Sequence, residues 1–338
     1  MKRLVICADG TWNRPEKKLG KDYPTNVLKV ARAISHDEDS IEQSVFYDWG
    51  VGSYIIALTG GAFGVGLSKN VMDAYRYIVH NYQPGDELYF FGFSRGSYTI
   101  RSLCGFINNC GILKQKFSNQ ITTAYRLYRN RQNKPNDSRS KQFKKDFTYN
   151  DDVKIHFVGV WDTVGALGIP FDGLSFLNEP FQFHDAKIGP NIQTARHALS
   201  IDELRDDYKP TIWKERPDVD IKQVWFAGVH TDIGGSYPPD QDKELLSDIP
   251  LSWMLGEATK CGLELEQHIF EELKPSATAT KHNEYKGFFK ILGKHLREIP
   301  EYSLIHSSVK ERFDNDSTYR PQNLVEYVRK CGWKELVD

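Results

Sequence analysis

The 338-residue chain carries 44 basic and 45 acidic residues, and its net charge of −1 provides no overall field that would gather nucleic acid or an anionic bilayer. Hydrophobic residues make up 40% and charged residues 26% of the chain, which excludes both a disordered polypeptide and one embedded mostly in a membrane. The length is enough for one large α/β domain or two small ones.

Short apolar runs and helical periodicities alternate along the chain. The apolar run at 4–8 predicts a buried strand, and helical spacing at 27–34 follows a suitable cap at Thr25. Further elements are expected as strands at 44–48, 87–91, 153–160 and 221–229, a glycine-rich loop through Gly66, a helix at 71–82 and a helix after the strand at 87–91. Strands that alternate with helices predict an α/β fold, with a mostly parallel central sheet and helices on both faces.

Four of the predicted strands end in polar, glycine-punctuated loops, after Ala8, Phe91, Val160 and Val229. The carboxyl ends of parallel strands share one edge of a sheet, and ligands bind beyond that edge. We therefore expect the functional residues to lie in these loops. A single domain is expected over 1–338, with insertions at about 114–150 and 168–215.

Five scattered cysteines, with no C-x-x-C pair, argue against a disulfide framework and against a structural zinc site. The apolar run near Met1 is too short for a secretory signal, and no stretch approaches the ~18 apolar residues of a transmembrane helix. These features lead us to expect a cytoplasmic protein.

The strongest motif is Gly92-Phe93-Ser94-Arg95-Gly96, a G-x-S-x-G between a predicted strand and a predicted helix. Small residues two positions to either side of the serine let a strained turn lie against neighbouring elements, and this turn raises the serine Oγ clear of the sheet. The N-terminus of the following helix offers N–H groups to a developing oxyanion. The motif predicts that Ser94 is a nucleophile.

A serine nucleophile needs a histidine base and a carboxylate that orients it. His230 follows a predicted strand, on the expected sheet edge of Ser94, and His306 is the alternative base late in the chain. Asp162 ends another predicted strand and keeps the chain order serine, aspartate, histidine. Asp232, two residues after His230, is the alternative acid. A purely structural role is the other interpretation of each residue.

Two backbone N–H groups would complete an oxyanion hole. The N–H of Arg95 is one candidate, and the N–H of Thr11 is the other, because Gly10 permits close backbone approach. The alternative for the segment 9–13 is a turn stabilised by its own Asp and Asn side chains. The glycine-rich run 60–66 lacks the G-K-[ST] ending of a P-loop and is expected to be a flexible loop near the mouth of the site.

Several blocks together resemble one known family. They are D-G-T-W-N at 9–13, P-G-D at 84–86 followed by G-F-S-R-G and Arg101, W-D-T-V-G at 161–165, R-H-A-L-S-I-D-E at 196–203 and G-V-H-T-D-I-G-G at 228–235 with Tyr237. The chain resembles the α/β-hydrolase family catalogued as domain of unknown function 2235, which includes one class of type VI secretion phospholipase effectors. The resemblance implies an α/β-hydrolase-like domain, a triad of Ser94, Asp162 and His230, and hydrolysis of carboxylic esters, with phospholipid acyl esters as the best-known substrates. For the region after Asp240, which resembles the family less clearly, we expect a structural role.

Hypotheses from different classes follow from these features. The first is a serine esterase or lipase that uses no cofactor or metal. The resemblance of the chain to a family that includes type VI secretion effectors implies that such an enzyme could be delivered by a secretion system. The second is a catalytically silent hydrolase-fold module that binds a membrane or protein partner through the basic segment 114–145. The third is a metal site formed by Asp9, Asp162, His230 and Asp232, which leaves the G-x-S-x-G motif unexplained. Nucleic acid is not expected as a partner, and the sequence indicates no oligomeric state.

Overall fold

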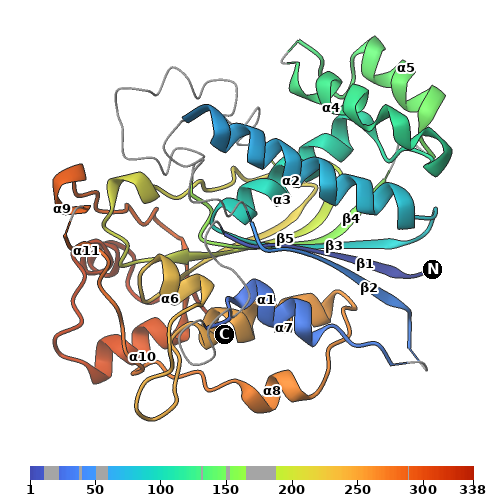
Figure 1. Cartoon of the computed structure of the whole chain (residues 1–338). Helices are drawn as coiled ribbons and strands as arrows, with labels where there is room; N and C mark the ends of the chain where they lie inside the picture. The colour runs from blue at the N-terminus through green and yellow to red at the C-terminus, as the bar shows by residue number, and fades with distance from the viewer. Residues whose placement is uncertain are drawn as a thin grey trace.

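The computed structural model describes residues 1–10, 23–37, 40–50, 60–130, 132–149, 153–164, 188–287 and 289–338. Within these residues the chain builds a central eight-stranded sheet of order β2-β1-β3-β4-β5-β6-β7-β8, and each strand runs parallel to its neighbours (Figure 1). The strands are β1 (Arg3–Ala8), β2 (Gln43–Asp48), β3 (Glu87–Phe93), β4 (Ile155–Trp161), β5 (Ile192–Ser200), β6 (Asp220–Phe226), β7 (Leu304–His306) and β8 (Leu336–Val337). The predicted α/β fold is confirmed.

Helices cover both faces of this sheet. Figure 1 shows α2 (Gly60–Asn81) and α3 (Arg95–Cys110) on one face, and α1 (Asn26–Ala33) and α7 (Asp248–Lys260) on the other. The other helical segments of the described ranges are η1 (Gln115–Gln120), α4 (Ile121–Arg129), α5 (Ser138–Phe147), η3 (Asp206–Tyr208), α6 (His230–Gly234), α8 (His268–Glu272), α9 (Phe289–Leu292), α10 (Ser307–Asn315) and α11 (Gln322–Cys331). No helix in the described part of the chain combines the length and the apolar character needed to cross a bilayer.

Both faces of β1 are buried because alternate side chains enter different layers of the core. Leu4 and Ile6 belong to the layer with residues of α2 and α3, and Val5 and Cys7 belong to the layer with residues of α1 and α7. None of these four side chains is exposed to solvent. This double burial explains why the strand reads as a continuous apolar run in the sequence.

Most predicted elements correspond to elements of the structure. Five predicted strands match β1, β2, β3, β4 and β6, and the Thr25 side chain caps α1 by accepting the N–H of Leu28 at 3.1 Å. The expected loop at 60–66 is wrong, because this run forms the first turns of α2. The apolar periodicity of α2 includes the buried residues Leu67 and Val71, so packing of the helix outweighs the low helix propensity of glycine.

The sequence patterns did not indicate β5. This strand lies between β4 and β6, inside the segment 168–215 that we expected to be an insertion. Two buried polar side chains interrupt its apolar run. Arg196 Nε donates to Glu257 Oε2 at 2.5 Å, and His197 Nε2 accepts the N–H of Thr163 at 3.1 Å. Because these partners lie far away in the chain, local periodicity could not show that the polar residues are buried.

The parallel order places the carboxyl ends of the strands at one edge. The register pairs Ala8 of β1 with Gly92 of β3, and Phe93 of β3 with Trp161 of β4. Trp161 is paired in turn with Ala198 of β5. The loops that follow β1, β3, β4 and β5 therefore start side by side, at the edge where parallel sheets bind ligands.

Candidate active site

Ser94 occupies the sharp turn between β3 and α3. Its backbone has φ 57° and ψ −120°, a positive-φ conformation that residues with a Cβ rarely adopt. The Ser94 N–H donates to the carbonyl oxygen of Trp161 at 3.1 Å, which ties the turn to the end of β4. The side chain does not cap α3, and 7% of the residue is exposed. A serine held on a strained strand-to-helix turn has the geometry of a nucleophile elbow.

Close backbone packing explains both glycines of the motif. A Cβ on Gly96 would lie 1.9 Å from the carbonyl oxygen of Ala8, at the end of β1. A Cβ on Gly92 would lie 2.8 Å from the carbonyl carbon and oxygen of Gly96. The spacing of the two glycines therefore lets the turn fold onto itself and against β1.

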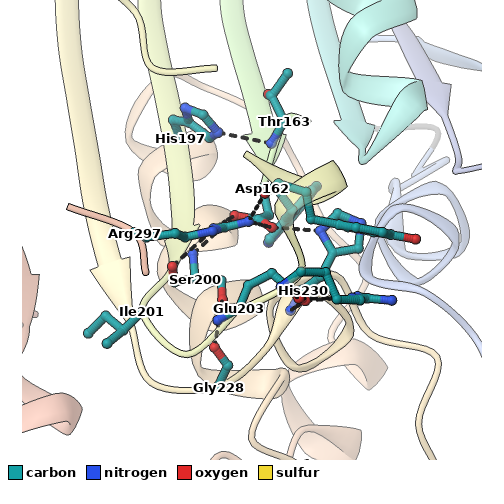
Figure 2. Close-up of polar contacts among 12 residues, drawn as sticks. Asp162, Thr163, His197, Ser200, Ile201, Glu203, Gly228, His230 and Arg297 are labelled. Atoms are coloured by element: carbon teal, nitrogen blue, oxygen red, sulfur yellow. Dashed lines mark hydrogen bonds and ion pairs between the residues drawn. The ribbon is translucent and has the colours of Figure 1, made fainter. Parts of the chain in front are cut away.

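His230 and Asp162 form a buried hydrogen-bonded pair (Figure 2). The His230 Nδ1 and Asp162 Oδ2 atoms are 2.6 Å apart, and both side chains are almost completely buried. His230 is the first residue of α6, after the loop that follows β6, whereas Asp162 directly follows β4. The His230 ring packs against the ring of Phe93, with 4.7 Å between the centroids. Since Phe93 precedes Ser94, the imidazole lies beside the turn that carries the serine.

The Asp162 carboxylate accepts four hydrogen bonds from residues that the structure describes. Oδ1 accepts the Ser200 N–H at 3.1 Å and Arg297 Nη1 at 2.6 Å, and Oδ2 accepts Arg297 Nη2 at 3.0 Å as well as the bond from the imidazole. Burial alone would raise the pKa of Asp162, but the Arg297 charge and the bond from His230 outweigh it and hold this pKa below its ordinary value. The carboxylate is therefore ionised at neutral pH, so His230 Nδ1 carries the shared proton and Nε2 is the basic nitrogen.

A second buried ion pair supports the backbone of His230. Glu203 Oε2 accepts the His230 N–H at 3.2 Å, and the two oxygens of Glu203 accept Arg205 Nε and Nη2, each at 2.8 Å. The Arg205 guanidinium lies 3.6 Å from the ring centroid of Tyr208. The Tyr208 ring meets the His230 ring edge-on, with 4.9 Å between centroids. Glu203 thus fixes the backbone of His230, and Tyr208 packs against its ring.

This environment keeps His230 neutral. Burial lowers the pKa of His230 below its ordinary value of 6.5, although the hydrogen bond and the charge of Asp162 oppose the shift. An imidazole with a lowered pKa is a free base near neutral pH. That is the form which can accept the proton of a serine hydroxyl.

The structure gives the alternative acid and the alternative base other partners. Asp232 Oδ1 lies 2.7 Å from His282 Nδ1. His306 Nδ1 lies 2.8 Å from Ser308 Oγ, and burial lowers the pKa of His306 to about 4. The catalytic roles of Ser94, Asp162 and His230 stay predictions, while the Asp162–His230 contact is a feature of the fold.

The two predicted oxyanion donors differ in what the structure describes. Arg95 is the first residue of α3, where the N–H groups point out of the helix end. Thr11 lies outside the described residues. Before it, Asp9 Oδ1 accepts the Gly10 N–H at 2.8 Å, and Asp9 Oδ2 accepts the Tyr47 hydroxyl at 2.8 Å. The alternative for this segment, a turn over 9–13 stabilised by its own Asp and Asn side chains, extends outside the described residues and stays a prediction.

Of the four residues of the metal hypothesis, Asp162 and His230 contact each other, but the carboxylates have other partners as well. Asp9 is bonded to Tyr47, Asp162 to Arg297 and Asp232 to His282. Over the described ranges, no group of three or more His, Cys, Asp or Glu side chains is placed to hold a metal ion.

Sequence reasoning missed Arg297, which contacts the proposed triad. Arg297 lies between α9 and β7, in the region for which the sequence suggests a structural role. It belongs to no motif and meets Asp162 only through the fold. A single arginine in a loop gives no sequence signal that could have identified it.

This chain is similar to a known protein family, to a yeast protein and to solved structures. A family model described as T6SS, Phospholipase effector Tle1-like, catalytic domain, matches residues 2–257. The uncharacterized protein YEL023C of Saccharomyces cerevisiae is 28% identical over 239 residues, which are 64% of this chain and 33% of that protein. An uncharacterized protein from Pseudomonas aeruginosa has a crystal structure that aligns with a TM-score of 0.50 and 15% identity, over 81% of this chain and 49% of that one.

A further solved structure is the Tle1 effector bound to the VgrG spike from the type 6 secretion system. It aligns with a TM-score of 0.43 and 17% identity, over 70% of this chain and 51% of that one. The chain thus spans 33% of the yeast relative and about half of each solved chain.

Proposed function

Because the chain belongs to the family of Tle1-like phospholipase effector catalytic domains, we propose that it is a serine hydrolase that cleaves carboxylic esters of lipids, with phospholipid acyl esters as the leading substrate class. The observation that carries the proposal is the buried His230–Asp162 pair, at 2.6 Å, beside the turn that holds Ser94. A serine on an elbow after a central strand of a parallel sheet is typical of the α/β-hydrolase fold.

The proposed reaction begins when the Ser94 hydroxyl oxygen attacks the acyl carbonyl carbon and His230 Nε2 takes the hydroxyl proton. Asp162 orients the imidazole through Nδ1 and stabilises the imidazolium. The N–H groups of Arg95 and Thr11 donate to the negatively charged oxygen of the tetrahedral intermediate. Collapse of this intermediate breaks the ester C–O bond, and the alcohol leaves with the proton from His230. Water then attacks the acyl-enzyme by the same route and releases the fatty acid.

The test is the variant S94A, assayed on p-nitrophenyl acyl esters and on phospholipid vesicles. We expect kcat/KM to fall by ~10³-fold or more, because the nucleophile is lost, while the unfolding transition stays in place. A matched control is S138A, which changes an exposed serine of α5 and leaves turnover unchanged. Full turnover by S94A would refute the proposal. Hydrolysis of the simple esters without release of fatty acid from vesicles would reject phospholipids as substrates.

A second candidate function is the silent module that binds an anionic partner. The observation that favours it is a hollow of about 820 Å³, whose cationic lining residues are Lys114, Lys141, Lys144, Lys145 and Arg216. Such a cluster attracts anionic surfaces. A fluorophosphonate probe separates the two candidates, because a silent module does not react with it, whereas the proposed hydrolase is labelled at Ser94. Co-sedimentation with vesicles that contain anionic lipid, lost on reversing the charge of Lys141 and Lys145, would support the binding function.

A further inference from the structure

Arg297 is completely buried against the carboxylate of Asp162. The exposed fractions of the two side chains are 1% and 0%. The guanidinium makes a fork, with 2.6 Å from Nη1 to Oδ1 and 3.0 Å from Nη2 to Oδ2 (Figure 2). Given the proposed function, on which this inference rests, we propose that Arg297 is a positioning residue of the active site, which holds the Asp162 carboxylate in the orientation where Oδ2 faces His230 Nδ1.

Without Arg297, each Asp162 oxygen would keep a single partner, Ser200 N–H on Oδ1 and the His230 ring on Oδ2. Two bonds from a planar guanidinium fix both the plane and the direction of the carboxylate. The other acceptor directions of Asp162 then point at the Ser200 N–H and at the His230 ring. Asp162 also has φ 39°, an uncommon backbone conformation that the surrounding contacts must hold.

Arg297 is itself held in place by backbone carbonyl groups. Nη1 also donates to the carbonyl of Ser200 at 3.0 Å, and Nη2 donates to the carbonyl of Tyr208 at 2.6 Å. The Asn323 side chain of α11 donates to the carbonyls of Arg297 and Ile201, at 3.0 and 2.9 Å. The fork therefore cannot swing away from Asp162 without breaking several buried hydrogen bonds.

The charge of Arg297 adds a second effect. Arg297 neutralises Asp162, so protonation of His230 places a new positive charge beside a carboxylate that is already paired. Other titratable groups near Asp162 and Arg297 in the described part of the chain include Glu203, Arg205, Tyr208, His197 and the more exposed His295, whose pKa burial and nearby positive charges, Arg297 among them, lower. The glutamate and arginine of this set neutralise each other, and burial lowers the pKa of His197 to about 3, which leaves it uncharged at neutral pH. Removal of the Arg297 charge should therefore make His230 easier to protonate.

Arg297 also connects the C-terminal region to the site. It lies beyond residues 2–257, which the family model matches. The segment just before Arg297 packs against the loop after β5, where Lys294 and Arg205 form an antiparallel β-bridge. Residues outside the matched part of the chain thus complete the contacts of the proposed triad.

The test compares R297M and R297K with R196M and R196K. Arg196 is a matched control because it is a buried arginine of β5, 3% exposed, that pairs with the carboxylates of Glu257 and Asp220. For each variant, kcat and KM for a p-nitrophenyl acyl ester are measured as a function of pH, and stability is measured by urea unfolding. S94A is measured in parallel.

We expect R297M to lower kcat by about 10²-fold, the loss typical of a misplaced catalytic group, with KM changed by less than about threefold. The acid limb of its kcat/KM profile should move up by about one pH unit, because a cation near His230 is gone. R297K keeps the charge, so its acid limb should stay near that of the wild type, with kcat between the wild type and R297M. R196M and R196K should lose stability without a change in kcat or in the acid limb.

The proposal is overturned if R297M keeps the kcat and the acid limb of the wild type, or loses only stability as R196M does. Should R297M fail to fold, R297K decides, because lysine keeps the charge but cannot form the fork, and an unchanged kcat would overturn the proposal. The S94A control separates a failure of the proposed function from a failure of the role proposed for Arg297. Turnover by S94A overturns the function proposed for the whole site, whereas an inactive S94A beside an R297M of wild-type behaviour overturns only the role of Arg297.

Discussion

Replacement of Gly96 by alanine tests whether the contact between the elbow and β1 positions the nucleophile. The new Cβ would lie 1.9 Å from the carbonyl oxygen of Ala8 and 2.7 Å from that of Asp9. An ordinary Cβ contact begins at 3.4 Å, so either β1 or the start of α3 must move by about 1.5 Å. Both contacted atoms belong to the backbone, and a change of side-chain rotamer therefore cannot relieve the clash.

The size of this movement sets the expected effects. Overpacking of this kind costs about 1–3 kcal/mol of stability or more. A misplacement of about 1 Å is enough to lower a rate by ~10²-fold, and we expect at least that loss of kcat in G96A. The matched control is G256A in α7, because a Cβ on Gly256 meets no heavy atom within 4 Å. There alanine should raise stability by about 0.5–1 kcal/mol and leave kcat unchanged.

Three measurements decide this prediction: turnover of a p-nitrophenyl acyl ester, the rate of labelling by a fluorophosphonate probe, and urea unfolding. G96A should be slow in the first two even where the third shows that it is folded. If G96A turns over substrate and reacts with the probe as fast as G256A does, the close packing of Gly96 on Ala8 is not what positions Ser94.

Three further substitutions test the choice of base and the buried charges. H230A should lower kcat by ~10³-fold or more, whereas H306A should keep kcat within about threefold, and the reverse order in a turnover assay would transfer the role of base to His306. Burial would raise the pKa of Glu257, but bonds from three basic side chains lower it from 4.5 to about 2. Because the folded pKa lies below the unfolded one, this carboxylate contributes about 3 kcal/mol above pH ~4.5, which is lost as the pH falls to about 2. In urea unfolding at several pH values, E257Q should be less stable than the wild type at neutral pH, and its free energy of unfolding should change less as the pH falls. Equal stability of the two proteins at neutral pH would show that the ion pairs of Glu257 contribute nothing.

The parts of the fold that could be predicted are those whose burial is written locally in the sequence. The run 4–8 forms a strand that is covered on both faces, so each of its residues had to be apolar. β5 could not be predicted, because its buried Arg196 and His197 are satisfied by Glu257 and Thr163, which no local window contains. Periodicity detects burial only where burial excludes polar residues.

The same limit applies to the candidate site. The Ser94 turn could be predicted because its two glycines and its place between a strand and a helix are local features. The choice between Asp162 and Asp232 could not be made by distance along the chain. Asp232 is two residues from His230 in α6, yet its carboxylate is bonded to His282, whereas Asp162 reaches the imidazole from the end of β4.

The buried charges around the imidazole come as closed pairs, and this arrangement has a consequence for the chemistry. Asp162 is paired with Arg297, and Glu203 is paired with Arg205, so each of these two buried carboxylates has a cation beside it. An aspartate that is fully bonded keeps its orientation and holds the histidine in one tautomer. The same pairing weakens its attraction for the imidazolium, which lowers the basicity of His230 and keeps it unprotonated to lower pH. In the proposed mechanism, His230 is therefore a base that is unprotonated near neutral pH rather than one that binds the proton strongly.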